Sequence, residues 1–110
     1  MDKQPTNKPK PRQQLVNQDL QLKINDLCFD KLIEAKKEEE ISGNQFRATQ
    51  MVISLLQDII KDGLDEAGWT EWELRREMGH LPGEQKLYEQ CVTKRRRIEA
   101  EIAELQKRII

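Results

Sequence analysis

Apolar residues recur along this chain at the three- and four-residue intervals of a helix that buries one stripe. The first such stretch covers residues 18–41, and Asn17 is placed to cap it. Its stripe consists of Leu20, Ile24, Leu27, Cys28 and Leu32. The second stretch, residues 45–67, is the most apolar segment and is predicted to lie at the centre of the core. Its broad apolar face contains Phe46, Val52, Ile53, Leu55, Leu56, Ile59 and Ile60.

Small and helix-breaking residues predict where these helices end. Ser42-Gly43-Asn44 is predicted to separate the first two helices, because glycine tolerates the left-handed conformation of a helix end and asparagine caps the next one. The second helix ends either at Gly63 or after Ala67. The apolar spacing continues through Ala67, which favours the longer helix, with Gly68 as its stop.

A short helix over residues 71–78 is predicted from the segment that follows. Thr70 and Glu73 have the spacing of a reciprocal capping box at a helix start. Trp69, just before the cap, is spaced to form a hydrophobic staple with Leu74. Trp69 and Trp72 are therefore predicted to be core and staple residues rather than a ligand cage.

The last helix, residues 84–109, is predicted to be the longest and to have a coiled-coil-like heptad seam. The seam consists of Tyr88, Cys91, Arg95, Ile98, Ile102, Leu105 and Ile109. It contains about two clean heptads, fewer than an independent coiled coil needs. We therefore expect it to pack against the first helix or against a second copy of the chain. The predicted fold is all-α, a small domain of about four helices.

Composition predicts a single domain with a tail. The chain has 110 residues, 36% of them hydrophobic and 35% charged, which is too little apolar surface for two cores. Residues 1–16 are rich in proline and almost without apolar side chains, so they are predicted to form a disordered basic tail, leaving residues 17–110 as one helical domain. The formal net charge of −1 gives no global attraction to nucleic acid or to anionic membranes.

Several classes of function lack their sequence motifs. No apolar run is long enough to span a bilayer and no secretory signal is present, so we expect a cytoplasmic protein without a membrane partner. His80 is the only histidine, and neither a nucleophile motif nor a phosphate loop occurs, so no enzyme activity and no cofactor are predicted. Cys28 and Cys91 are too scattered for a metal site and are expected to be reduced, partly buried thiols.

Basic residues near the start of the last helix offer a possible nucleic-acid surface. Within the run Lys94–Arg97, Arg95 is spaced to pair with Glu99 and Arg97 with Glu101, so a salt-bridged helix face is the favoured interpretation. The alternative is phosphate binding by side chains from this run and from the short helix. Its candidate residues are Arg75, Arg76, His80, Lys94 and Arg96.

The segment EAGWTEWELRREMG resembles the start of the second helix in helix-turn-helix domains of phage-repressor type. More broadly, residues 53–109 resemble the C-terminal half of MerR-type transcription regulators, in which a helix, a Gly-aromatic turn and a short helix precede a long dimerising helix. The winged DNA-reading half of that family is absent from residues 1–50. The resemblance thus implies dimerisation through residues 84–109.

The sequence predicts a non-catalytic helical binding or regulatory protein. Its partner is expected to be a second copy (a homodimer) or another protein, engaged through the last helix. The predicted interface residues are Tyr88, Cys91, Ile98, Ile102, Leu105 and Ile109. The alternative is a transcription regulator of helix-turn-helix type that binds DNA or RNA.

Overall fold

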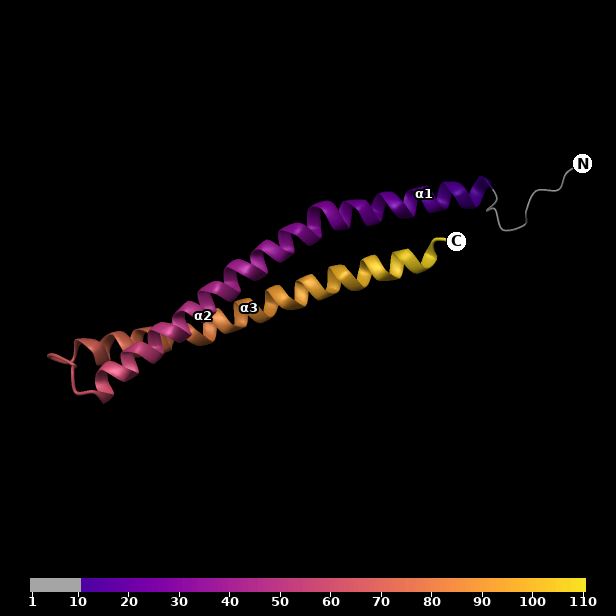
Figure 1. The fold of residues 1–110 in the computed structure, drawn as a ribbon. Coiled ribbons are helices and arrows are strands. Elements are labelled where there is room, and N and C mark those ends of the chain that lie inside the picture. Colours follow the sequence, from indigo (N-terminus) through magenta and orange to yellow (C-terminus); the bar gives the residue numbers. More distant parts are fainter. Residues whose placement is uncertain (1–10) are drawn as a thin grey trace, which may run out of the picture.

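The structure, a computed structural model, describes residues 11–110. In this range the chain forms two helical arms that fold back on each other as a hairpin (Figure 1). The first arm runs without interruption through α1 (Pro11–Asp26), the π-helical turn η1 (Leu27–Leu32) and α2 (Ile33–Lys61). The second arm is α3 (Trp69–Arg108). The hairpin is a rod of 93 × 17 × 16 Å.

The all-α prediction is confirmed, but the prediction of about four helices is wrong. Residues 18–41 and 45–67 were expected as separate helices, yet the first arm is continuous through Ser42-Gly43-Asn44. Within the helix, the Ser42 hydroxyl donates a hydrogen bond to the Glu39 carbonyl oxygen at 3.1 Å, so this inward-facing polar group is satisfied. Gly43 is buried beneath the ring of Tyr88, where any side chain would collide. The glycine therefore serves close helix packing instead of ending the helix.

The predicted break between 71–78 and 84–109 is also absent, because α3 continues through Pro82 and Gly83. An interior proline removes one backbone hydrogen bond and costs about 3 kcal/mol. Apolar packing offsets part of this cost, since Leu81 lies half-buried in the same seam as Tyr88. The inward positions of α3 thus keep one heptad spacing along the whole helix.

The turn between the arms begins earlier than predicted. Gly63 has a φ of 73°, and its N–H donates to the Ile60 carbonyl oxygen at 3.0 Å. The Leu64 N–H donates to the Ile59 carbonyl oxygen at 3.0 Å, which completes a Schellman motif. The expected extension to Ala67 is therefore wrong, because Gly63 already satisfies the last carbonyl groups of α2.

The start of α3 lacks the predicted capping box. Gly68 occupies the N-cap position with a φ of 75° and has no side chain to donate or accept. The backbone N–H of Thr70 instead donates to the Asp65 carboxylate at 3.0 Å. This carboxylate satisfies a free backbone donor at the positive end of the helix dipole, which is the role that had been assigned to Thr70 and Glu73.

At the open end of the rod, α1 begins at Pro11, so residues 11–16 of the predicted disordered tail are helical. The rest of that predicted tail, residues 1–10, lies outside the described range. Asn17, expected as a cap, lies inside α1 and bonds with the end of the chain. Its amide donates to the Ile110 carbonyl oxygen at 3.1 Å and its side-chain oxygen accepts from the Ile110 N–H at 3.4 Å.

The wide turn η1 corrects the register between α1 and α2. Buried positions in α2 follow a seven-residue repeat at Ala35, Ser42, Thr49 and Leu56. Extended backwards, this repeat would place an inward position of α1 at residue 21, one residue later than the observed Leu20. A π-helical turn absorbs one extra residue. Because of η1, α1 and α2 therefore turn their apolar stripes toward the same second arm.

Candidate interaction surface

The six predicted interface residues lie on the inward side of α3, facing the first arm. Ile102 is buried, with 8% of its surface exposed, in a rod whose buried hydrophobic residues also include Leu20 and Ile24. Tyr88, Cys91, Ile98, Leu105 and Ile109 are half-buried. Of the two arrangements expected for this seam, the structure contains packing against the chain's own first helices. The surfaces that the hairpin leaves uncovered therefore lie outside this seam.

Arg95 and its carboxylate partners form a charged clamp across the seam. Its guanidinium donates to Glu39 of α2 and, through Nη1, to Glu99 at 3.0 Å. The hydrogen bond to Glu39, followed by that to Glu99, raises the pKa of Arg95, so it stays cationic. The predicted pair of Arg95 with Glu99 is confirmed. An ion pair at an inward heptad position fixes which residues of the two arms face each other.

The candidate nucleic-acid residues do not form one compact patch. Arg76 and Lys94 are 18 residues apart on α3, which separates them by about 27 Å. Carboxylates also engage three of them: Arg75 with Glu71 at 2.9 Å, Arg76 with Glu77 at 3.5 Å, and Lys94 with Glu38 at 3.2 Å. His80 is exposed on α3 between Arg76 and Lys94, and Arg96 is exposed two residues after Lys94.

The tryptophans lie on the surface at the tip of the hairpin, so the prediction that they are core residues is wrong. Trp69 is 66% exposed and Trp72 is 55% exposed. Their rings meet edge to face with centroids 6.3 Å apart, and the Arg76 guanidinium lies 5.2 Å from the centre of the Trp72 ring. The second arm starts only at Trp69, so no element of the described chain extends beyond the tip to cover it (Figure 1).

The tip is also strongly acidic. Residues 58–73 contain six carboxylates and one lysine, a net charge of −5. The carboxylates are Asp58, Asp62, Asp65, Glu66, Glu71 and Glu73. Leu64, 65% exposed, adds an apolar side chain to the same turn. The tip therefore combines exposed apolar groups with negative charge.

One side of α2 is mostly apolar and largely exposed, and we call its apolar residues the α2 flank. It consists of Ile41, Ala48, Val52, Leu55 and Ile59. Ile41 is 68% exposed and Leu55 is 60% exposed. The opposite side of α2 is polar, with exposed Lys36, Arg47, Gln50, Ser54 and Gln57. A two-helix hairpin covers only the middle of the broad apolar face of α2, which leaves the α2 flank in water.

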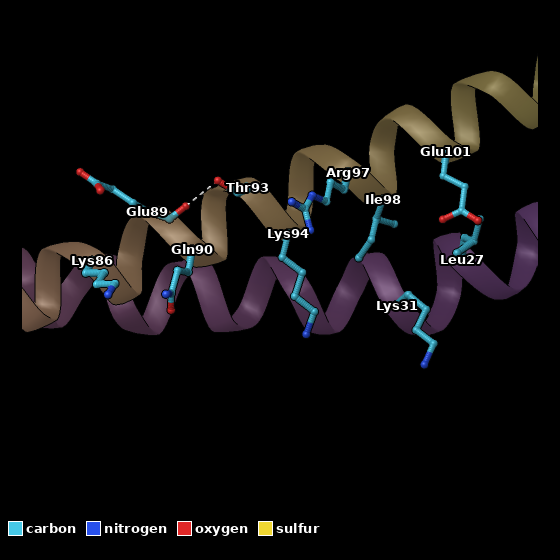
Figure 2. A pocket seen from close by; sticks show the side chains of 10 residues that line it. All are labelled: Leu27, Lys31, Lys86, Glu89, Gln90, Thr93, Lys94, Arg97, Ile98 and Glu101. Carbon is cyan, nitrogen blue, oxygen red and sulfur yellow. Dashed lines mark hydrogen bonds between the residues drawn. The ribbon is translucent and has the colours of Figure 1, made fainter.

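The α2 flank continues toward the open end of the rod as a groove between the two arms. A small hollow first joins Ile41 to the half-exposed Leu87 of α3. Beyond it lies an open groove of about 660 Å³, which we call the basic groove. Figure 2 shows Leu27 and Ile98 between the helices and the amines of Lys31 and Lys94 projecting on one side. The groove also contains Lys86 and Arg97, so four cations outnumber Glu89 and Glu101.

Metal binding has no support from these residues. Across residues 11–110, no three histidine, cysteine or acidic side chains gather as ligands. Cys28 lies in η1 and Cys91 in α3, and both are free, half-buried thiols. No helix in the described range combines the length and apolar character required to cross a bilayer.

Comparison with known proteins gives no relative: no family model, no curated protein and no solved structure matches this chain. The resemblance to MerR-type regulators, and the dimerisation through residues 84–109 that it implies, remain predictions. The α2 flank, the basic groove and the tip are therefore the features of the molecule that can indicate its function. The sequence contained a signal for the flank, since Ile41, Ala48 and Leu55 recur at seven-residue intervals beside the buried positions.

Proposed function

We propose that this chain is a non-catalytic helical protein that works by binding another helical surface along the α2 flank. The observation that supports this proposal most strongly is the contrast between the two sides of α2. One side exposes Ile41, Val52 and Leu55, whereas the other is polar. Contiguous apolar surface of this kind on a soluble protein marks an interaction site. Spacings of three, four and seven residues favour a helix as the partner.

Burial of the α2 flank supplies a reasonable driving force. Enclosing a large aliphatic side chain contributes about 1.5–3 kcal/mol, and less for one already partly covered. Ile41, Val52 and Leu55 would each contribute about 1–2 kcal/mol, which is enough for specific association once Leu87 and the basic groove add their contacts. A partner would also supply burial that the hairpin lacks, because none of its large side chains in the described range is fully enclosed.

The test replaces the α2 flank by Ile41→Gln, Val52→Gln and Leu55→Gln. The matched control replaces polar-side residues, with Arg47→Gln and Ser54→Gln. Helix content is checked by circular dichroism, and association is measured by light scattering and by capture from extracts of the native cell. The flank variant should lose every association that the wild type and the control retain. Equal association by all three proteins would refute the proposal.

Nucleic-acid binding is a second candidate, favoured by one observation. Lys31, Lys86, Lys94 and Arg97 line a single groove, although the residues first predicted for this role are dispersed. Phosphate contacts by these side chains would weaken steeply with salt. Titration of labelled DNA and RNA at two salt concentrations, with wild type and a Lys31→Glu/Arg97→Glu variant, tests it. Binding that neither salt nor the variant reduces would exclude the groove as the site.

A further inference from the structure

We infer that the partner of the α2 flank is a second copy of this chain, docked antiparallel so that the tip of each copy enters the basic groove of the other. This inference rests on the proposed function, because it names the occupant of the same flank. Four features of the described residues support it: the symmetry of the flank, the position of the groove, the charges at both sites and the available area.

Two large residues of the α2 flank are placed symmetrically about its smallest residue, whereas Val52 and Ile59 would face the polar Asn44 and Lys37. Ile41 and Leu55 each lie seven residues from Ala48, on the same side of the helix. In a twofold antiparallel pair, each residue of one copy meets the residue of the other copy that lies equally far from the axis in the opposite direction along the chain. An axis at Ala48 would therefore place Ile41 of one copy against Leu55 of the other. The methyl side chain of Ala48 at the crossing point would let the two α2 helices approach closely.

The same axis brings the tip to the groove. Asp62 and Glu34 are equally far from Ala48, as are Asp65 and Lys31. The turn of one copy would thus lie beside Lys31 and Leu27 of the second. Glu38 pairs with Lys94 and Glu39 with Arg95 across the hairpin, so Arg97 and Ile98 lie about one turn nearer the same place. These are residues of the basic groove. Their closeness to the tip of the second copy follows from the axis at Ala48 alone.

The chemistry of the two sites is complementary. The tip carries the net charge of −5 over residues 58–73 together with exposed Leu64 and Trp69. The groove offers the Lys31 amine, the Arg97 guanidinium and apolar contacts from Leu27 and Ile98 (Figure 2), whereas the Lys94 amine is already paired with Glu38. Opposite charges would then meet at both ends of the pair. A parallel pair would instead set acidic tip against acidic tip, which is unfavourable.

The area is also sufficient. From Leu27 to Ile59 the flank and groove extend about 45 Å at 1.5 Å per residue. With a rod width of 17 Å, the footprint is about 750 Å² per copy, close to the roughly 800 Å² per partner typical of stable complexes. The product would be a four-helix arrangement in which each hairpin covers the apolar side of the other.

The test is a charge exchange. A groove-reversed variant carries Lys31→Glu and Arg97→Glu, whereas a tip-reversed variant carries Asp62→Lys and Glu66→Lys. None of these four side chains makes a hydrogen bond or ion pair within the described residues, so both variants should fold. A control variant, Arg96→Glu with Lys107→Glu, changes the net charge as the groove-reversed variant does but lies outside the groove. Sedimentation equilibrium gives the dimer dissociation constant of each.

We expect each reversed variant alone to dimerise at least tenfold more weakly than wild type, while the control changes less than threefold. Mixing the two reversed variants should recover most of the wild-type affinity, because at one end the acidic groove then meets a tip that carries two introduced lysines and a net charge reduced from −5 to −1. At the other end, the basic groove still meets the unchanged acidic tip. Restoration by mixing distinguishes this pairing from general charge repulsion.

Three outcomes would overturn the inference. A wild type that stays monomeric to about 100 μM excludes the second copy as the occupant. Equal dimerisation of all variants excludes contact between tip and groove, as does weakening that mixing fails to restore. The proposed function is refuted by a different result, namely that the glutamine variant of the α2 flank associates as well as the wild type does. A monomeric wild type that still captures a different protein through the flank would leave the proposed function intact.

Discussion

Gly43 gives a sharp prediction about the packing of the two arms. An ideal Cβ at this position would lie 2.9 Å from Cε1 and 3.2 Å from Cδ1 of Tyr88. The ring cannot swing aside freely, because it stacks on Phe46 with a centroid distance of 6.1 Å and an interplanar angle of 26°. Gly43→Ala should therefore force the arms apart locally.

The magnitude follows from two opposing effects. Alanine gains about 1 kcal/mol over glycine inside a helix, whereas one extra carbon in a packed contact costs about 1–3 kcal/mol. We expect Gly43→Ala to lower the free energy of unfolding by about 1 kcal/mol. The control is Gly79→Ala in α3, where nothing lies within 4 Å of the added carbon. That substitution should instead stabilise the chain by about 1 kcal/mol.

Urea unfolding followed by circular dichroism measures both changes. A double-mutant cycle isolates the cause: with Tyr88→Ala already present, Gly43→Ala should become stabilising, because the ring that opposed it is gone. If Gly43→Ala stabilises the chain as much as Gly79→Ala does, the close approach of Tyr88 to α2 is wrong. The same conclusion would follow if the Tyr88 substitution left its effect unchanged.

Three further predictions test other parts of the hairpin. Pro82→Ala should raise the free energy of unfolding by about 2–3 kcal/mol, because it restores a backbone hydrogen bond in a continuous α3; no change in urea unfolding would mean that α3 is broken there. Trp69→Ala should alter that free energy by less than about 0.5 kcal/mol, since the ring is exposed, and a loss of several kcal/mol would return it to the core. Replacing the clamp by Glu39→Leu with Arg95→Leu should raise the melting temperature. Glu39→Leu alone should lower it, because Arg95 then has one partner fewer. A thermal scan in which the double variant melts below the single variant would refute this account.

The helical class and the α3 seam were predictable because each depends on the spacing of apolar residues alone. Tyr88, Ile98 and Ile102 fall on the inward side of α3 in the structure as in the sequence. The chain breaks were not predictable in the same way. Whether Gly43 ends a helix or admits a neighbouring ring depends on Tyr88, 45 residues later, and the spacing around Gly43 contains no information about it.

Surface residues were harder to place than core residues. Val52 and Leu55 were expected in the core with the rest of the broad apolar face, but both are exposed. The share of that face left uncovered depends on how many helices pack against it. With four short helices Trp69 would be covered, whereas in a two-armed hairpin it lies at the tip. The basic groove was not predicted, because Lys31 and Arg97 meet only once the register of the two arms is fixed.

Disulfide trapping at the proposed axis tests the central claim most directly. In a chain carrying Cys28→Ser and Cys91→Ser, a single Ala48→Cys should form an intermolecular disulfide rapidly on mild oxidation, because the two copies of this residue would lie within the roughly 4 Å Cβ separation that the bond needs. Ser54→Cys, on the polar side of α2, should form no intermolecular disulfide under the same conditions. Equal trapping at both positions, or none at Ala48→Cys, would contradict the antiparallel pairing along the α2 flank.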